Sequence, residues 1–246
     1  MTAVGLIGCG GIAQDVLAAL HASPANGVSI VGALARPGRG EAARARLCGI
    51  DVVEALDDLL ARGPALVAEV AGQSAVAEHG DAVLRSGVDC LVISVGALAD
   101  PALFARLRSA AHDGSSRILL PAGAIGKPPA AWRGSPAEQT VDLDQLNRRT
   151  VLYKGTAGEA ALLYPQNANV AAAVALAGLG FDATEVELVA DPDAPGNIHE
   201  IEAEGVAGSF AIQLQGKASR TNPKTSALAA LSVARALLNR HATIVI

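Results

Sequence analysis

Two short stretches of the chain contain residue types that could do chemistry. GCGGIA places Gly8, Gly10 and Ala13 in the pattern G-x-G-x-x-A, and NIHEIEAEG places His199 in a polar segment behind a proline-rich turn. A glycine turn before a helix can bring backbone N–H groups close to a phosphate. Histidine has an unperturbed pKa of about 6.5, so it can exchange a proton near neutral pH. The first stretch therefore predicts anion binding, and the second offers an acid or base.

The glycine motif lies between a predicted strand and a predicted helix. AVGLIGCGGIAQDVLAAL has the pattern of a short apolar strand, a turn and an amphipathic helix, and VSIVGALA that of a second buried strand. In this context Gly8 permits a tight turn, Gly10 lets a pyrophosphate approach, and Ala13 allows close helix packing. The motif predicts a dinucleotide site formed by Gly8, Gly10, Gly11, Ile12 and Ala13. A glycine-rich turn without a ligand is the alternative.

The end of the second predicted strand bears on the choice of dinucleotide. NAD-specific sites usually have Asp or Glu there, which holds the ribose 2′-hydroxyl. Here Arg36 stands in that place in ALARPGRG, and Arg39 follows closely. Guanidinium groups suit a 2′-phosphate, but both arginines could equally be solvated loop charges. NAD and NADP are therefore both candidate cofactors.

Strands and helices alternate from the N-terminus to about residue 120. The further predicted strands are ALVAEVA, DCLVISVGAL and SRILLPAG, and helices are predicted over AVAEHGDAVLRSG and PALFARLRSAAHDG. This alternation predicts an α/β fold with a Rossmann-type, doubly wound parallel sheet, which forms a dinucleotide-binding domain over residues 1–120. Residues after PAGAIG become rich in Pro and polar types, which places a domain crossover near residue 121.

Residues 121–221 are predicted to form a second, α+β domain with a largely antiparallel sheet. Its predicted strands are TVLYKG, TEVELVADP, NIHEIEAEGV and GSFAIQLQGKA, and AGEAALLYPQNANVAAAVALAGLG is predicted to form two helical pieces broken at Pro165. The closing segment, residues 222–246, contains a predicted helix that we expect to pack back on the first domain.

Composition narrows the class of function. The net charge is −5 without a clustered basic face, which argues against a nucleic-acid partner. The apolar stretch VAAAVALAGLGF is shorter than the roughly 20 residues of a membrane span, and no export leader is evident. Cys9, Cys48 and Cys90 are not in a metal-ligand spacing, so no metal site is expected. We expect a cytoplasmic protein that acts on a small molecule and has no membrane partner.

Four segments together resemble the L-aspartate dehydrogenases: GCGGIA, PAGAIG, YPQNANVAAAVALAGLG, and NIHEIEAEG followed by NPKTSALAALS. The resemblance extends over nearly the whole chain. It implies a Rossmann-type N-terminal domain, a second domain with substrate and dimer contacts, and oxidation of L-aspartate with NAD or NADP. The products would be reduced cofactor and iminoaspartate, which hydrolyses to oxaloacetate and ammonia or enters NAD biosynthesis.

The resemblance also implies roles for individual residues. The family's catalytic histidine falls on His199, and its cofactor contacts fall on Ala124 of GAIG and Asn169 of NAN. His199 would take the proton of the substrate amine or activate the water that hydrolyses the imine, and Asn197 and Glu200 are neighbours that could orient it. The other histidines are interpreted as structural or solvated: His21, His79, His112 and His241.

An aspartate substrate has two carboxylates, which cations or helix N-termini would meet. Lys224, Thr225 and Ser226 form such a donor cluster at the start of the last predicted helix. A simple helix cap explains Thr225 and Ser226 equally well. Lys127 and Arg133 are further candidates that the sequence does not rank. Capping is also the simpler interpretation of Asn167, which follows Pro165 closely.

The chain departs from the family pattern at one place, and two other functions remain open. Relatives have a longer connection between GAIG and KPPAAW, whereas here Gly126 is followed directly by Lys127, a difference that bears on the start of the second sheet and on the dimer contacts. The alternatives are a related NAD(P) enzyme, such as a homoserine dehydrogenase or a dihydrodipicolinate reductase relative, and a dinucleotide-sensing protein without catalysis. A homodimer is expected, because it would bury a sheet face of the second domain.

Overall fold

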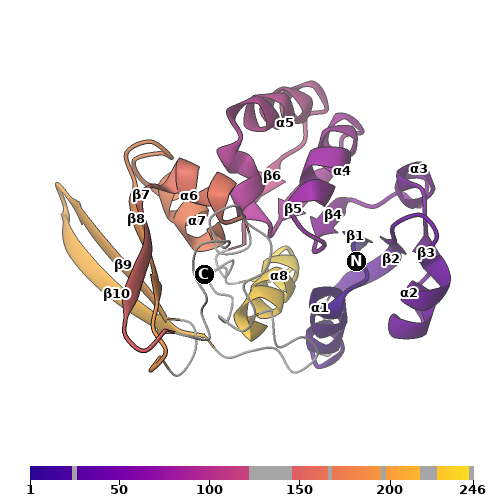
Figure 1. Ribbon diagram of the computed structural model, residues 1–246. Helices are drawn as coiled ribbons and strands as arrows, with labels where there is room; N and C mark the ends of the chain where they lie inside the picture. The colour runs from indigo at the N-terminus through magenta and orange to yellow at the C-terminus, as the bar shows by residue number, and fades with distance from the viewer. Residues whose placement is uncertain (24–26, 122–145, 166–167, 195–197, 217–225, 244–246) are drawn as a thin grey trace.

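The computed structural model describes residues 1–23, 27–121, 146–165, 168–194, 198–216 and 226–243. These residues form two lobes (Figure 1). The first lobe contains a six-stranded parallel sheet in the order β3-β2-β1-β4-β5-β6. Its strands are β1 (Thr2–Ile7), β2 (Val28–Leu34), β3 (Val52–Val53), β4 (Leu66–Glu69), β5 (Asp89–Val92) and β6 (Ile118–Leu119). The strand order reverses between β1 and β4, which is where doubly wound sheets bind ligands.

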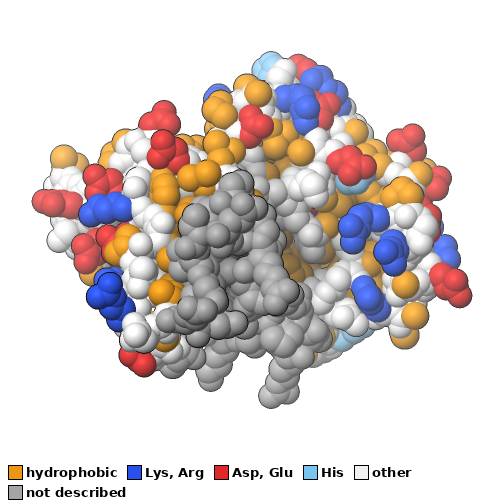
Figure 2. All heavy atoms as spheres, in the orientation of Figure 1, with side chains coloured by type: hydrophobic (Ala, Val, Ile, Leu, Met, Phe, Trp, Pro, Cys, Tyr) orange, Lys and Arg blue, Asp and Glu red, His pale blue; other side chains and the backbone are white. Residues whose placement is uncertain are grey.

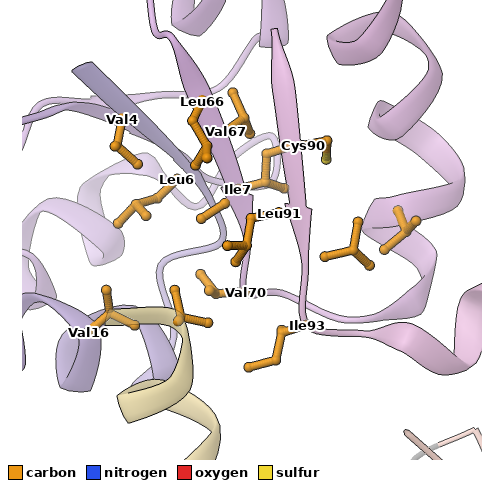
Figure 3. Packing of buried hydrophobic residues seen from close by; sticks show 14 of the residues in the cluster. Val4, Leu6, Ile7, Val16, Leu66, Val67, Val70, Cys90, Leu91 and Ile93 are labelled. Atoms are coloured by element: carbon orange, nitrogen blue, oxygen red, sulfur yellow. The ribbon is translucent and has the colours of Figure 1, made fainter. Parts of the chain in front are cut away.

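Helices connect these strands and cover the sheet. They are α1 (Gly11–His21), α2 (Gly40–Arg46), α3 (Leu56–Leu60), α4 (Gln73–Arg85) and α5 (Pro101–Asp113), with a 3-10 helix, η1 (Val95–Ala99), after β5. The central strands are buried on both faces, and Figure 3 shows their side chains packed together: Leu6 of β1, Leu66 of β4 and Leu91 of β5 are at most 1% exposed. Burial on both faces explains why these strands are apolar runs rather than alternating patterns.

One predicted strand is shorter than expected. DCLVISVGAL was expected to be a single strand, but β5 ends at Val92 and η1 begins at Val95. The chain turns there because the Ser94 N–H and hydroxyl both donate hydrogen bonds to the Glu69 carboxylate, each at 3.1 Å. The apolar run continues across the turn because η1 is buried as well. Periodicity alone does not separate a buried strand from a buried helix.

The second lobe contains two antiparallel strand pairs and two short helices. β7 (Thr150–Thr156) pairs with β8 (Glu185–Ala190), and β9 (Ile198–Gly205) pairs with β10 (Gly208–Gln215). α6 (Ala157–Leu163) and α7 (Asn169–Ala177) are separated around Pro165, where proline interrupts the helical hydrogen bonding. The predicted fold class, a parallel Rossmann-type sheet followed by an α+β region with antiparallel strands, is confirmed.

The C-terminal helix α8 (Ala227–Asn239) returns to the first lobe and packs against α1. Its side chains Ala230, Val233 and Leu237 belong to the same buried core as the parallel sheet. The two chain ends also meet, because the Thr2 N–H donates a hydrogen bond to His241 Nε2 at 3.1 Å. In the described part of the chain, no helix is both long and apolar enough for a membrane span.

Candidate functional site

The glycine turn joins β1 to α1 at the carboxyl edge of the parallel sheet. Gly8 has a φ of +112°, and a Cβ at this position would lie 2.9 Å from the Ala71 Cβ and 3.0 Å from the Ala71 backbone. Both the dihedral angle and the close approach therefore require glycine. Ala13 is fully buried, so a larger side chain there would separate α1 from the sheet.

The N-terminus of α1 follows the glycine turn directly. Gly10 is the N-cap residue and has no side chain that could cap the helix. Nothing lies within 4 Å of a Cβ placed on Gly10. Gly11 and Ile12, which begin the helix, are half-buried. Backbone N–H groups at such a terminus bind phosphate oxygens, and the helix dipole favours their negative charge, so the turn fits a dinucleotide pyrophosphate.

The connection from β2 to α2 contains the two arginines that bear on cofactor choice. Arg36 and Arg39 are both exposed, and Arg36 is the second residue after β2. A carboxylate that directly follows the neighbouring strand β3 organises this connection: Glu54 accepts hydrogen bonds from the N–H groups of Gly38 at 2.8 Å and Gly40 at 2.6 Å. These two bonds lower the pKa of Glu54, so its carboxylate is ionised at neutral pH.

A buried carboxylate that was not expected from the sequence organises the same edge of the sheet. Glu69, the last residue of β4, is 1% exposed and accepts hydrogen bonds from the N–H groups of Ala71 at 2.8 Å and Gly72 at 2.6 Å. Its carboxylate also accepts the two hydrogen bonds from the N–H and the hydroxyl of Ser94. Burial raises the pKa of Glu69 although the four donors oppose this effect. Glu69 thus ties the β4–α4 connection to the β5–η1 connection, beside the glycine turn that Ala71 contacts.

Two hydrogen bonds join this edge to the second lobe. Gln73 Nε2, at the start of α4, donates to the Pro165 carbonyl at 2.7 Å, and the Gly96 N–H in η1 donates to Asn169 Oδ1 at 2.9 Å. Asn169 is the first residue of α7, so this side chain lies at the junction of the two lobes. Because its carbonyl oxygen faces Gly96, its amino group is the part of the carboxamide that can donate to a ligand.

The β9–β10 hairpin presents one apolar and one polar face. Residues that pair directly across two antiparallel strands share a face, and alternate residues along a strand share a face. His199 pairs with Leu214 and therefore lies on the apolar face. That face comprises His199, Ile201, Ala203, Phe210, Ile212 and Leu214, whereas Glu200, Glu202 and Glu204 lie on the opposite face.

His199 is half-buried, and its Nε2 is buried with no hydrogen-bond partner among the described residues. Burial lowers the pKa of His199 below its ordinary value of 6.5, so the imidazole is neutral at neutral pH. Glu200 does not orient this ring: it lies on the polar face, where it accepts a hydrogen bond from Gln213 Nε2 at 3.0 Å. A neutral imidazole with an unpartnered nitrogen can take a proton from a ligand.

Other predicted site residues have structural contacts or lie outside the described residues. Ser226 is 2% exposed, and its hydroxyl accepts a hydrogen bond from the Leu228 N–H at 3.2 Å. This bond caps the N-terminus of α8, as the helix-cap interpretation of Ser226 predicts. Burial raises the pKa of the Cys90 thiol to about 12, which suits a packing residue. The predictions outside the described residues are Ala124, the Gly126–Lys127 junction, Arg133, Asn167, Asn197, Lys224 and Thr225.

The strand order, the glycine turn and the helix that begins directly after it define a dinucleotide-binding protein of the Rossmann type. Comparison with protein families agrees for both lobes. Residues 8–121 match the family model described as homoserine dehydrogenase, NAD binding domain, and residues 108–240 match the model described as aspartate dehydrogenase, C-terminal. A nicotinamide dinucleotide is therefore the cofactor class of the first lobe.

Curated relatives extend this assignment over the full length. L-aspartate dehydrogenase from Ruegeria pomeroyi is 47% identical over 98% of this chain and 93% of its own length. The enzymes of the same name from Cupriavidus necator and Pseudomonas aeruginosa are 43% and 42% identical, and the alignments cover 98% and 95% of this chain and 98% and 96% of the relatives. The chain belongs to the L-aspartate dehydrogenase family, as its four sequence segments predicted.

Comparison with solved structures supports the same fold. The crystal structure of aspartate dehydrogenase from Thermotoga maritima matches with a TM-score of 0.75 at 24% identity, over 100% of this chain and 99% of that chain. The alignment with the Ruegeria protein spans 262 positions and this chain has 246 residues, so the relative has residues that this chain lacks.

Proposed function

We propose that this protein is an L-aspartate dehydrogenase that oxidises L-aspartate at C2 with NAD or NADP. The products are reduced cofactor and iminoaspartate, which water converts to oxaloacetate and ammonia. The observation that supports this most strongly is identity of 42–47% over nearly the full chain to proteins named L-aspartate dehydrogenase. That identity includes the second lobe, where the C-terminal family model extends across His199.

The residues of the glycine turn would hold the cofactor. The backbone at the start of α1, in Gly10, Gly11 and Ile12, is suited to the pyrophosphate, because a helix N-terminus that follows a glycine turn presents N–H groups and the positive end of the helix dipole to an anion. Asn169 would donate its amino group to the nicotinamide half from the lobe junction. The nicotinamide supplies the acceptor for the hydride that leaves C2. Ala124 is an additional contact that the family resemblance predicts.

His199 is the proposed acid–base residue. Hydride leaves C2 readily only when the amino nitrogen has a free lone pair, so the substrate ammonium must first lose a proton. The buried Nε2 of His199 has no described partner and is neutral at neutral pH, so it is suited to accept that proton. It then returns the proton to water. A positioned base of this kind contributes about 10²- to 10⁴-fold in rate.

We also propose that the protein is a homodimer that works in the cytoplasm. The feature that supports a homodimer is the apolar face of the β9–β10 hairpin, on which Phe210 is 54% exposed and Ile212 is 46% exposed. Figure 1 shows this hairpin at the end of the second lobe farthest from the parallel sheet. A two-stranded sheet is marginally stable alone, and a second copy of the chain would cover the exposed apolar side chains.

The test is turnover with a panel of substrates. Purified protein is mixed with NAD or NADP and one of L-aspartate, L-glutamate, L-alanine, L-homoserine or L-malate, and the near-ultraviolet absorbance of the reduced cofactor is followed. Reduction with L-aspartate above all others is expected. Preference for L-homoserine would support the homoserine dehydrogenase alternative, for which only the first lobe has a family match. Cofactor binding without any turnover would support a sensing role.

A further inference from the structure

The acidic residue that could influence cofactor choice directly follows β3 rather than β2. The two strands are neighbours, and the Ala35 N–H donates to the Val53 carbonyl at 2.9 Å. Glu54, the next residue, therefore lies beside the connection that contains Arg36 and Arg39. Figure 2 shows several basic side chains on the right of this face, the side on which Figure 1 draws α2, β2 and β3.

The Glu54 carboxylate is fixed by the backbone of this connection. Its Oε2 accepts from the Gly38 N–H at 2.8 Å and its Oε1 from the Gly40 N–H at 2.6 Å. A Cβ on Gly40 would collide with Oε1, so the carboxylate lies directly against the backbone. Arg44 donates to the Val52 carbonyl at 3.3 Å and also helps to keep Glu54 ionised. The negative charge is therefore held in place and does not depend on a mobile side chain.

This fixed charge lies beside the β2–α2 connection, where a Rossmann-type site contacts the ribose of the adenosine. The residue at the end of β2 faces the adenosine 2′-position, which is a hydroxyl in NAD and a phosphate in NADP. Backbone N–H groups in such a connection commonly bind phosphate, and here Glu54 already occupies those of Gly38 and Gly40. The charge of Glu54 also repels a phosphate, whereas Arg36 attracts it.

We propose that Glu54 is a specificity-determining residue that lowers the affinity for NADP relative to NAD, against the opposite effect of Arg36. The inference rests on the proposed cofactor site, because it assumes that a dinucleotide adenosine lies at this edge. It does not depend on the identity of the amino-acid substrate. Its test therefore measures binding of cofactor fragments and requires no turnover.

The experiment is calorimetric titration of the full chain with ADP-ribose and with ADP-ribose 2′-phosphate. In Glu54→Gln the affinity for the 2′-phosphate compound should rise by about three- to tenfold, while the affinity for ADP-ribose changes less than about twofold. Glu54→Asp retains the charge and should keep the ratio of the two affinities close to that of the wild type. Glu78→Gln is the matched control, because it removes one exposed charge from α4 and should leave the ratio unchanged.

The outcomes separate this inference from the proposed function. An unchanged ratio in Glu54→Gln would overturn it, and so would an equal loss of both affinities, which would show that Glu54 only holds the connection in shape. A similar shift in Glu78→Gln would reduce the effect to net charge and also contradict it. If neither compound binds the wild type, the cofactor site itself is wrong and the inference fails with it. Binding with the expected shift but no turnover of L-aspartate would contradict only the proposed function.

Discussion

The cofactor edge of the first lobe and the histidine hairpin of the second lobe are constructed in opposite ways. At the cofactor edge, β1 and β4 are covered on both faces, and Glu69 satisfies four donors from two connections. On the β9–β10 hairpin, apolar side chains are exposed and His199 Nε2 has no described partner. The first lobe therefore organises its site with its own residues. The second lobe offers groups that a ligand and a second copy of the chain would complete.

The largest expected effect comes from replacing His199, the proposed acid–base residue. His199→Asn should lower kcat with L-aspartate by about 10²- to 10⁴-fold, while the affinity for ADP-ribose stays within about twofold, because the glycine turn is in the other lobe. Steady-state kinetics and calorimetry measure the two effects. His79→Asn, in α4, is the matched control and should retain activity. Equal activity of the two variants would mean that His199 is not the base.

A core substitution and a hairpin substitution should affect stability and assembly differently. Leu66→Ala in β4 should lower the free energy of unfolding by about 2–5 kcal/mol, because Leu66 is fully buried. Phe210→Ser, at a position that is 54% exposed, should change monomer stability by less than about 0.5 kcal/mol but weaken self-association. Urea unfolding at low protein concentration and analytical ultracentrifugation distinguish the two effects. Unchanged sedimentation of Phe210→Ser would place the dimer contact elsewhere.

The turn of the first lobe should be sensitive to a single methyl group. Gly8→Ala adds a Cβ at positive φ and places it 2.9 Å from the Ala71 Cβ. It should therefore lower the free energy of unfolding by about 1–3 kcal/mol and reduce the affinity for ADP-ribose. Gly208→Ala is the control, since Gly208 also has a φ well beyond the left-handed helical region, +136°, but nothing lies within 4 Å of its Cβ. The difference between the variants, by thermal unfolding and calorimetry, isolates the contact with Ala71. Equal losses would show that this contact has no role.

The smallest effect concerns pH. Burial lowers the pKa of His199 below 6.5, so the neutral base should persist below that pH. The acid limb of kcat/KM for L-aspartate should accordingly lie below pH 6.5, and it should be absent in His199→Asn. Below its ordinary pKa this histidine binds more protons in the unfolded chain than in the folded one, so its contribution to stability is lost as pH falls. An acid limb at or above pH 6.5 would contradict the buried environment.

Most of the fold was predictable because its signals are local. The apolar runs of β1 and β4, the glycine turn at Gly8 and the break at Pro165 each come from adjacent residues. The lengths of buried elements were less certain, and the expected strand DCLVISVGAL ends early because Ser94 bonds to Glu69, which is 25 residues away in sequence. Tertiary hydrogen bonds of this kind leave no periodic pattern in the sequence.

The site was predictable to a lesser degree. The glycine motif predicts the cofactor turn from adjacent residues, but the catalytic role of His199 is predicted mainly by the family resemblance, because the burial of its Nε2 without a partner among the described residues depends on the folded hairpin. Glu69 and Glu54 were missed. A lone acid in the apolar run ALVAEVA was the available signal for Glu69. No comparable pattern in the sequence indicates Glu54, since its proposed role depends on β3 lying beside β2.

We expect hydride to pass directly from C2 of L-aspartate to the nicotinamide of a cofactor bound at the glycine turn. The most direct test uses L-aspartate with deuterium at C2 and determines by mass spectrometry whether the deuterium appears in the reduced cofactor. We predict that the wild type transfers the label quantitatively and that His199→Asn transfers it far more slowly. Reduced cofactor without deuterium, or no reduction with L-aspartate at all, would contradict the assignment of this chain as an L-aspartate dehydrogenase.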